Sequence, residues 1–326
     1  MLHKIMSDTI KLDISGKTQI PTRMGFGDGL VIAGKNDPNV VALCADLTDS
    51  TRMSPFKKEF PDRFIQMGIY EQALVSISAG LALAGKIPFC TSYAMFSPGR
   101  SWEQVRTACL SKANVKIIGS HAGVSVGPDG ATHQALEDMA ITRCIPDLIV
   151  INPCDSIEAR KATIEAAKVV GPVYIRLARE KTPVMTADDT PFAIGKAQVV
   201  REGKDCAIIA CGPLLYQSLM AAEELAKERI ECRVINNHTI KPMDQVTVIA
   251  AAKDCGAVVT VEEHQIAGGM GSAVAEILAQ RNPVPMEFVG VHDKYGQSGQ
   301  PDELLEFYGM GVKDVVKAVK AVIKRK

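Results

Sequence analysis

A single carboxylate, Glu71, stands where an apolar helix is predicted to begin. Leu74, Ile77 and Leu81 recur at helical spacing after it, and Gly68 precedes it by three residues. A negative charge near a helix N-terminus is an ordinary structural feature, because the helix dipole favours it there. A carboxyl group withdrawn from water could also share a proton with a weak base, which is general acid–base chemistry. The spacing alone favours the structural interpretation.

Two further groups of side chains could build a binding site. Tyr93 and Phe96 follow an apolar run and lie three residues apart, although such a pair is more often ordinary core. His121, Asp129 and His133 lie in a glycine-rich segment that leaves a predicted strand. This position favours ligand binding, because α/β folds bind ligands at the carboxyl ends of their parallel strands. The two histidines have no third partner at a metal-ligand spacing, which disfavours a metal site.

The elements that must position these residues are short apolar runs alternating with helix-length segments. Strands that are apolar on both faces are typical of parallel sheets covered by helices, so we predict an α/β protein. The predicted strands include residues 40–43, 115–118, 148–151, 173–175, 206–210 and 257–261, and the predicted helices include 22–35, 214–228, 271–280 and 312–324. Polar and helix-breaking residues at 182–191 indicate a linker. We therefore expect a first domain over residues 1–186 and a smaller α/β domain with five strands over 187–326.

The composition disfavours several classes of function. Lys plus Arg and Asp plus Glu each number 37, so no long-range field attracts nucleic acid or an acidic membrane surface. The apolar runs are too short to span a bilayer and the N-terminus lacks a signal-peptide layout, so we expect a cytoplasmic protein. The nine cysteines include no Cys-x-x-Cys pair, which favours buried, reduced thiols.

The stretch around Glu71 resembles the pyrimidine-binding domain of transketolases, and the resemblance extends over essentially the whole chain to the second half of such an enzyme. The match is to the C-terminal subunit of the split, thiamine-diphosphate-dependent type. It implies that Glu71 hydrogen-bonds N1′ of the aminopyrimidine and favours the imino form, which takes the proton from thiazolium C2 to give the ylid. It also implies that Tyr93 and Phe96 surround the pyrimidine and that Asp46 lies close to the thiamine. Full-length transketolases tend to carry a third aromatic where this chain, like the two-subunit enzymes, has Gly99.

Residues 121–138 resemble the transketolase substrate loop and give the most specific match in the sequence. This implies that His133 binds the C1 hydroxyl and carbonyl region of the donor, and that Asp129 binds the C2 hydroxyl of the acceptor aldose. His121 would lie near the sugar phosphate. Arginine forks match phosphate geometry. The residues that fit the family pattern for phosphate are Arg23, Ser50 and Arg179, with Arg176 as an alternative to Arg179.

The resemblance leaves out the half of the enzyme that binds diphosphate. Such enzymes hold it through Mg²⁺, using a Gly-Asp-Gly that opens a segment ending in asparagines. Residues 27–29 spell Gly-Asp-Gly, but they lie inside a predicted helix and no asparagine pair follows. We therefore expect an N-terminal transketolase subunit as partner, which supplies the Mg²⁺ ligands in an α2β2 heterotetramer. The expected activity is transfer of a two-carbon ketol unit between sugar phosphates, in the pentose phosphate pathway.

Two other interpretations remain open at this point. The β-subunit of a 2-oxoacid dehydrogenase of the pyruvate type shares the two-domain plan and the glutamate, but residues 121–138 favour sugar phosphates. A non-catalytic assembly subunit could keep the fold, although a scaffold has no physical need for the glutamate, aromatics and histidines together. The glycine cluster at 267–271 is not a dinucleotide motif. It resembles the C-terminal domain of transketolases and of the β-subunits of 2-oxoacid dehydrogenases, in which Glu262 and His264 would be structural.

Overall fold

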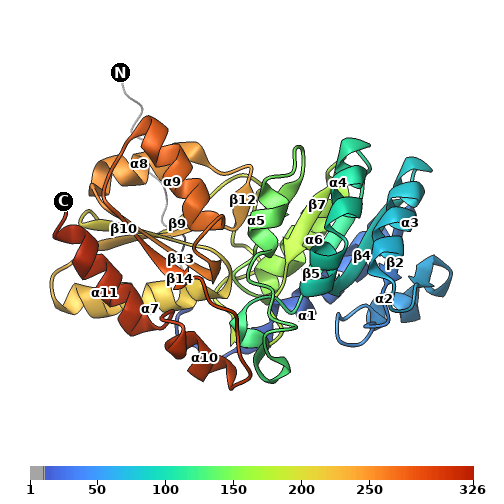
Figure 1. Cartoon of the computed structure of the whole chain (residues 1–326), viewed down its shortest axis with the longest axis horizontal. Coiled ribbons are helices and arrows are strands. Elements are labelled where there is room, and N and C mark those ends of the chain that lie inside the picture. Colours follow the sequence, from blue (N-terminus) through green and yellow to red (C-terminus); the bar gives the residue numbers. More distant parts are fainter. Residues whose placement is uncertain (1–9, 11) are drawn as a thin grey trace.

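The computed structural model describes residue 10 and residues 12–326. Residues 1–9 and 11, which include the stretch examined for a signal peptide, lie outside the described residues. Two α/β units lie side by side, the N-terminal one on the right and the C-terminal one on the left in Figure 1. The predicted α/β class is confirmed.

The N-terminal unit is built on a seven-stranded sheet with the order β12-β6-β7-β5-β4-β2-β3. Every adjacent pair is parallel except β12 with β6. The strands β2, β5 and β7 are buried along their whole length, which explains their nearly continuous apolar sequences. The strands are β2 (Val40–Cys44), β3 (Phe64–Gln66), β4 (Ile87–Tyr93), β5 (Lys116–Ser120), β6 (Ile149–Ile151), β7 (Val173–Arg176) and β12 (Thr239–Lys241).

Helices cover this sheet, and the closest packing joins α1 (Thr22–Asn36) to α6 (Ser156–Lys168). Glycine is required at this contact, because a Cβ atom at Gly29 would come within 2.7 Å of the Arg160 carbonyl oxygen. The Gly-Asp-Gly letters at 27–29 thus belong to a helix, as predicted. The other helical segments of this unit are α2 (Ser54–Glu59), η1 (Pro61–Arg63), α3 (Glu71–Leu83), η2 (Met95–Arg100), α4 (Trp102–Leu110), η3 (Val124–Asp129) and α5 (Asp138–Arg143).

The C-terminal unit has the smaller sheet, five strands in the order β14-β13-β10-β11-β9, with only β9 antiparallel to its neighbour. The expected number of strands in this sheet is confirmed. Its strands are β9 (Gln198–Arg201), β10 (Cys206–Ala210), β11 (Cys232–Asn236), β13 (Val258–Gln265) and β14 (Met286–Val291). Its helical segments are η4 (Gly212–Leu214), α7 (Leu215–Lys227), α8 (Gln245–Cys255), α9 (Met270–Arg281), α10 (Pro301–Phe307) and α11 (Val312–Ile323).

The two units are joined by a hydrophobic cluster that contains residues of both. A single buried cluster contains Leu43 and Ile117 from the first sheet together with Ile209 and Val258 from the second. The segment predicted as a linker is held in place rather than loose. Its β8 (Lys181–Pro183) pairs with β1 (Gln19–Pro21), and the backbone N–H groups of Met185 and Thr186 donate to Asp155 Oδ2. The units therefore form one continuous body in which a residue of one can position a residue of the other.

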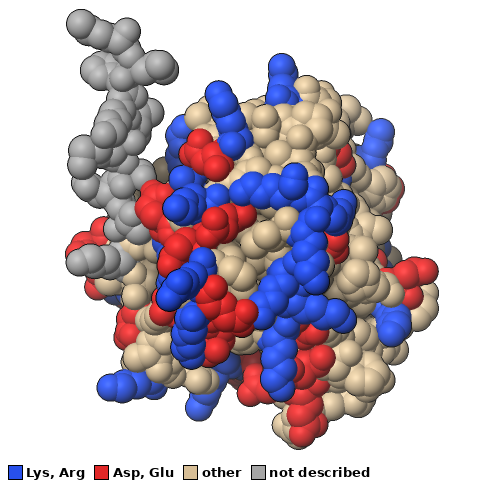
Figure 2. Space-filling view, turned by 90° about the vertical axis from the view of Figure 1, so that its left-hand side faces the viewer, with Lys and Arg blue, Asp and Glu red and all other residues tan. Residues whose placement is uncertain are grey.

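The surface and the cysteines agree with the compositional analysis in most respects. On the face shown in Figure 2, basic and acidic side chains are interspersed rather than separated into fields of one sign. Eight of the nine cysteines are buried, whereas Cys144 is exposed, contrary to the general expectation of burial. Within the described part of the chain, no helix is both long and apolar enough to cross a membrane.

Candidate active site

Glu71 begins α3 and is almost completely removed from solvent. Its exposed fraction is 1%, although the two preceding residues, Ile69 and Tyr70, are 74% and 61% exposed. Gly68 makes the preceding turn with a φ of 68°, a conformation that glycine adopts without strain. The carboxylate is therefore buried, whereas the two apolar residues before it form an exposed rim.

Arg100 is the charged partner of Glu71. Its Nη1 atom lies 2.9 Å from Glu71 Oε2, and its own side chain remains 46% exposed. The same guanidinium lies over the Phe96 ring, with 4.8 Å between Cζ and the ring centroid. Arg100 thus joins the buried carboxylate to an aromatic side chain at the surface.

Four predicted site residues gather in one cluster of rings at the carboxyl ends of β4 and β5. Tyr93 stacks on His121 with ring centroids 3.9 Å apart and on Phe96 with centroids 6.1 Å apart. His133 meets Phe96 edge-on at 5.3 Å and Tyr93 at 6.1 Å. Residues from three separate segments of the sequence therefore form one aromatic surface, which Arg100 links to Glu71.

His121 lies inside this cluster as a neutral imidazole. Burial, with the nearby charges of Arg23, Arg179 and His133, lowers the pKa of His121 to about 3. Its Nδ1 lies 2.8 Å from the Ser120 hydroxyl. The backbone of His121 has a φ of 57°, which is unfavourable for a residue with a Cβ atom and is often found at functional sites. The neutral ring can donate or accept one hydrogen bond to a ligand.

Two arginines, Arg23 and Arg179, lie close enough to His121 for their charges to act on it. Arg23 donates from Nη1 to the Ser50 carbonyl oxygen at 2.6 Å and from Nε to the Arg179 carbonyl oxygen at 3.1 Å. Burial and the charges of Arg52 and Arg179 lower the pKa of Arg23 from its usual range. Cations held close enough to disfavour one another would be stabilised by an anion. This cluster of Arg23, Arg52 and Arg179 is consequently suited to a phosphate.

The two aspartates of the predicted site lie at its edges and are both exposed. Asp129 Oδ1 is 3.3 Å from Arg179 Nη1, so it belongs to the arginine cluster. Asp46 lies at the end of β2 with a φ of 59°, and its backbone N–H donates to Gln66 Oε1 at 2.9 Å. Its side chain is exposed, so the carboxylate can face a ligand or a second chain.

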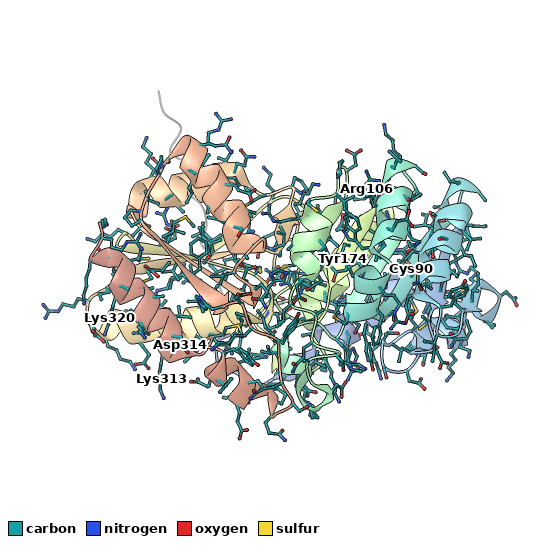
Figure 3. The ribbon with its side chains drawn as sticks, viewed as in Figure 1. Cys90, Arg106, Tyr174, Lys313, Asp314 and Lys320 are labelled. Carbon is teal, nitrogen blue, oxygen red and sulfur yellow. The ribbon has the colours of Figure 1, made fainter. Side chains whose placement is uncertain are left out.

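Arg176 and Arg179 are clearly separated by the structure. Arg176 is buried, with Nε 2.8 Å from Asp138 Oδ2, and the Tyr174 hydroxyl donates to the same oxygen at 2.7 Å. Tyr174 lies near the middle of the molecule in Figure 3. Arg179 is partly exposed and reaches Asp129. The geometry therefore favours Arg179, and not Arg176, for contact with an anion.

Sequence analysis missed two residues that complete this arrangement, Arg100 and Arg52. Nothing in the spacing of Arg100 indicated that it would meet a carboxylate 29 positions earlier. Arg52 could have been suspected only from its neighbour Ser50, since its effect arises through space.

Among the described residues, no group of three or more His, Cys, Asp or Glu side chains is placed to hold a metal ion.

Comparison with known proteins agrees with this geometry. Residues 18–185 match the pyrimidine-binding domain of transketolase, and residues 195–315 match the transketolase C-terminal domain. The chain is 41% identical to a putative transketolase C-terminal section from Methanocaldococcus jannaschii, over 93% of this chain and 96% of that protein. It is 40% identical to a 6-deoxy-6-sulfo-D-fructose transketolase subunit from a Clostridium species, over 92% of this chain and 94% of that protein.

Solved structures give the same result. A chain described as "Split gene transketolase, inactive beta4 tetramer" superposes with a TM-score of 0.89 at 44% identity, covering 94% of this chain and 99% of that one. The chain spans about half the length of full-length transketolases, such as 50% of the human enzyme at 36% identity. The chain therefore belongs to the transketolase family, in which it corresponds to the C-terminal subunit of the split type.

Proposed function

We propose that this subunit, with an N-terminal partner chain, transfers a two-carbon ketol unit between sugar phosphates using thiamine diphosphate. The observation that carries the proposal is the buried carboxylate of Glu71, which Arg100 links to the cluster of Tyr93, Phe96, His121 and His133. A buried acid beside near-parallel aromatic rings suits an aminopyrimidine, which presents both a flat face and ring nitrogens.

The residues present fit the pyrimidine end of the cofactor. Glu71 would hold a ring nitrogen and exchange a proton with it, while Tyr93 and Phe96 would pack against the ring and Asp46 would lie nearby. When bound, the cofactor supplies a carbon nucleophile that carries the ketol unit. Burial keeps water from the carboxylate, which is why Glu71 can exchange a proton with a weak base rather than with solvent.

The Gly-Asp-Gly of this chain lies in a packed helix and is not suited to the diphosphate end of the cofactor. The Gly-Asp-Gly of residues 27–29 is part of α1, and its second glycine packs against α6. Mg²⁺ prefers several oxygen ligands together with the diphosphate. We therefore assign the Mg²⁺ and diphosphate ligands to the partner subunit.

The sugar phosphates would bind across the imidazoles and the arginine cluster. His133 would contact the donor near C1 and its carbonyl, and Asp129 the C2 hydroxyl of the acceptor. The phosphate would be bound by Arg23 and Arg179, close to Ser50 and His121. The lowered pKa of Arg23 supports this assignment, because burial and the charges of Arg52 and Arg179 both disfavour its cation, and a bound anion would offset them.

The partner would cover the rim around Glu71. Ile69, Tyr70, Ile77 and Leu83 are large apolar side chains exposed at or just before α3. Several large apolar side chains left exposed on and beside one helix are a feature of protein contact surfaces. The solved relative is described as an inactive β4 tetramer, which supports the requirement for a second kind of chain. We infer an α2β2 assembly that acts in pentose phosphate metabolism. We place it in the cytoplasm, because reduced thiols such as these are stable there.

The experiment combines the subunit with its partner, Mg²⁺ and thiamine diphosphate. Xylulose 5-phosphate and ribose 5-phosphate should yield seven-carbon and three-carbon sugar phosphates. Two relatives are named for 6-deoxy-6-sulfo-D-fructose and for apulose 4-phosphate, so both sugars belong in the donor panel. Decarboxylation of pyruvate without ketol transfer would move the assignment to a 2-oxoacid dehydrogenase β-subunit. An assembled complex that performs neither reaction would indicate a non-catalytic assembly subunit.

A further inference from the structure

One carboxylate of the C-terminal unit reaches across to the segment that carries His121, Asp129 and His133. Glu263 is buried in β13, and its Oε1 accepts a hydrogen bond of 2.6 Å from the backbone N–H of Ser125. The donor and acceptor are 138 positions apart in the sequence. The bond therefore joins the second sheet to residues 121–138 of the first unit.

The backbone of this segment is fitted closely around Glu263. Gly123 has a φ of 90°, and a Cβ atom there would come within 2.2 Å of Glu263 Oε1. Any larger residue would push the segment away from the carboxylate. The close approach places the Ser125 N–H in line with Glu263, which fixes the start of η3.

Arg176 holds the other end of the same segment to the same residue. Its Nη2 donates to the Glu263 carbonyl oxygen at 2.8 Å and to the Ala135 carbonyl oxygen at 3.3 Å, while its Nε binds Asp138. Burial raises the pKa of Glu263, and the positive charge of Arg176 opposes that shift. Both ends of the segment are thus bonded to one position of β13.

A second contact from the C-terminal unit supports the middle of the segment. Gln134 donates from Nε2 to the Gln297 carbonyl oxygen and to the Val124 carbonyl oxygen, both at 2.9 Å. A Cβ atom at Gly130 would lie 2.6 Å from Ser298 Oγ. Residues 121–138 are therefore enclosed between Glu263 and the stretch before α10.

We propose that Glu263 is a positioning residue: its carboxylate sets the conformation of residues 121–138 and so places His133 and Asp129 for the sugar substrates. This rests on the proposed function for the identity of the substrates, but not for the mechanical role. A displacement of about 1 Å at reacting groups can cost about a hundredfold in rate. The C-terminal unit, which lies outside the ring cluster, would thereby control the substrate geometry of the first unit.

Three variants separate the effect of side-chain length at position 263 from the effect of its charge. Glu263→Asp keeps the charge beside Arg176 but withdraws the oxygen from Ser125. Glu263→Gln keeps an acceptor at the same reach. Glu262→Asp is the matched control, because Glu262 is also buried in β13 but accepts from Met270 and Gly271 at the start of α9, within its own unit.

The readouts are amide hydrogen exchange of residues 121–138 and steady-state kinetics of the complex with its partner. Glu263→Asp should accelerate exchange in this segment at least tenfold and lower kcat/KM for the acceptor sugar about tenfold to a hundredfold. Glu263→Gln should stay within about threefold of wild type in both measurements. The control should change exchange at residues 270–272 and leave the segment as in wild type.

The proposal would be overturned if Glu263→Asp left exchange in the segment unchanged, or if its kinetic loss equalled that of the control. If the wild-type complex transfers no ketol unit, the proposed function fails, and the exchange measurement alone still decides the role of Glu263. If Glu263→Asp does not fold, Gly123→Ala takes its place, since its Cβ would push the segment off the carboxylate.

Discussion

Replacing Glu71 by glutamine separates catalysis from structure at the site. Glutamine has the same shape and keeps an oxygen for Arg100, but it carries no charge and cannot exchange a proton. The side chain is 1% exposed and begins α3, so the variant probes the chemistry of one buried group.

The expected magnitudes follow from the burial of the two partners. Arg100 is 46% exposed, so solvent screens the ion pair and its loss should change the free energy of unfolding by at most about 1 kcal/mol. General acid–base catalysis by one positioned group contributes about 10²- to 10⁴-fold in rate, or roughly 3–5 kcal/mol of activation free energy. Activity should therefore fall far more than stability.

The assay compares Glu71→Gln with Arg100→Met in the complex with the partner subunit, Mg²⁺ and thiamine diphosphate. Ketol transfer should fall about 10²- to 10⁴-fold in Glu71→Gln, while thermal unfolding and assembly remain close to wild type. Arg100→Met removes the ion pair but keeps the acid, so its loss should be much smaller. Equal losses in the two variants, or a loss below tenfold in Glu71→Gln, would refute a proton-transfer role for Glu71.

Three further predictions concern packing, phosphate and pH. Gly29→Ala should lower the free energy of unfolding by about 1–3 kcal/mol, because its Cβ would clash with the Arg160 carbonyl oxygen. Asp28 is exposed, so Asp28→Ala should change neither stability nor activity. A large activity loss in Asp28→Ala would instead support a cofactor role for residues 27–29. Arg179→Lys should raise KM about tenfold for a phosphorylated acceptor and leave KM for the unphosphorylated sugar unchanged, and an equal rise for both would remove Arg179 from the phosphate site. Burial lowers the pKa of His238 to about 4, below its unfolded value of 6.5, so its contribution to stability is present above pH 6.5 and is lost as the pH falls towards 4. His238→Gln should therefore reduce the stability difference between pH 8 and pH 5, measured by chemical denaturation, by about 2 kcal/mol, and an unchanged difference would contradict the shift.

The sequence predicted the long elements because their apolar periodicity reflects burial directly. The helix predicted over residues 214–228 is α7 (Leu215–Lys227), and the strand predicted over 206–210 is β10 (Cys206–Ala210). The three-residue strands β6 and β12 had different outcomes: β6 was predicted from its apolar run, whereas β12 was missed, since three residues are too few to establish a period. Their pairing partners come from distant parts of the chain, which no local pattern reveals.

The candidate site was predictable where residues follow strand ends and not where contacts depend on side-chain direction. Tyr93 and His121 end neighbouring strands β4 and β5, so parallel topology brings them together. The ion pair between Glu71 and Arg100 depends on how the irregular turn η2 packs against α3. No local sequence pattern specifies that packing. The roles assigned to these residues remain predictions for the experiments above.

The placement of β12 has a consequence for any attempt to divide this chain. Thr239–Lys241 belongs by position to the C-terminal unit, yet it forms the edge of the seven-stranded sheet beside β6. A fragment ending near residue 187 would leave β6 with an uncovered hydrogen-bonding edge, which invites self-association. The complementary fragment would carry a strand with no sheet to join. We accordingly expect the two units to be inherited together and to be expressed together. An exchange between homologues should likewise replace both units at once.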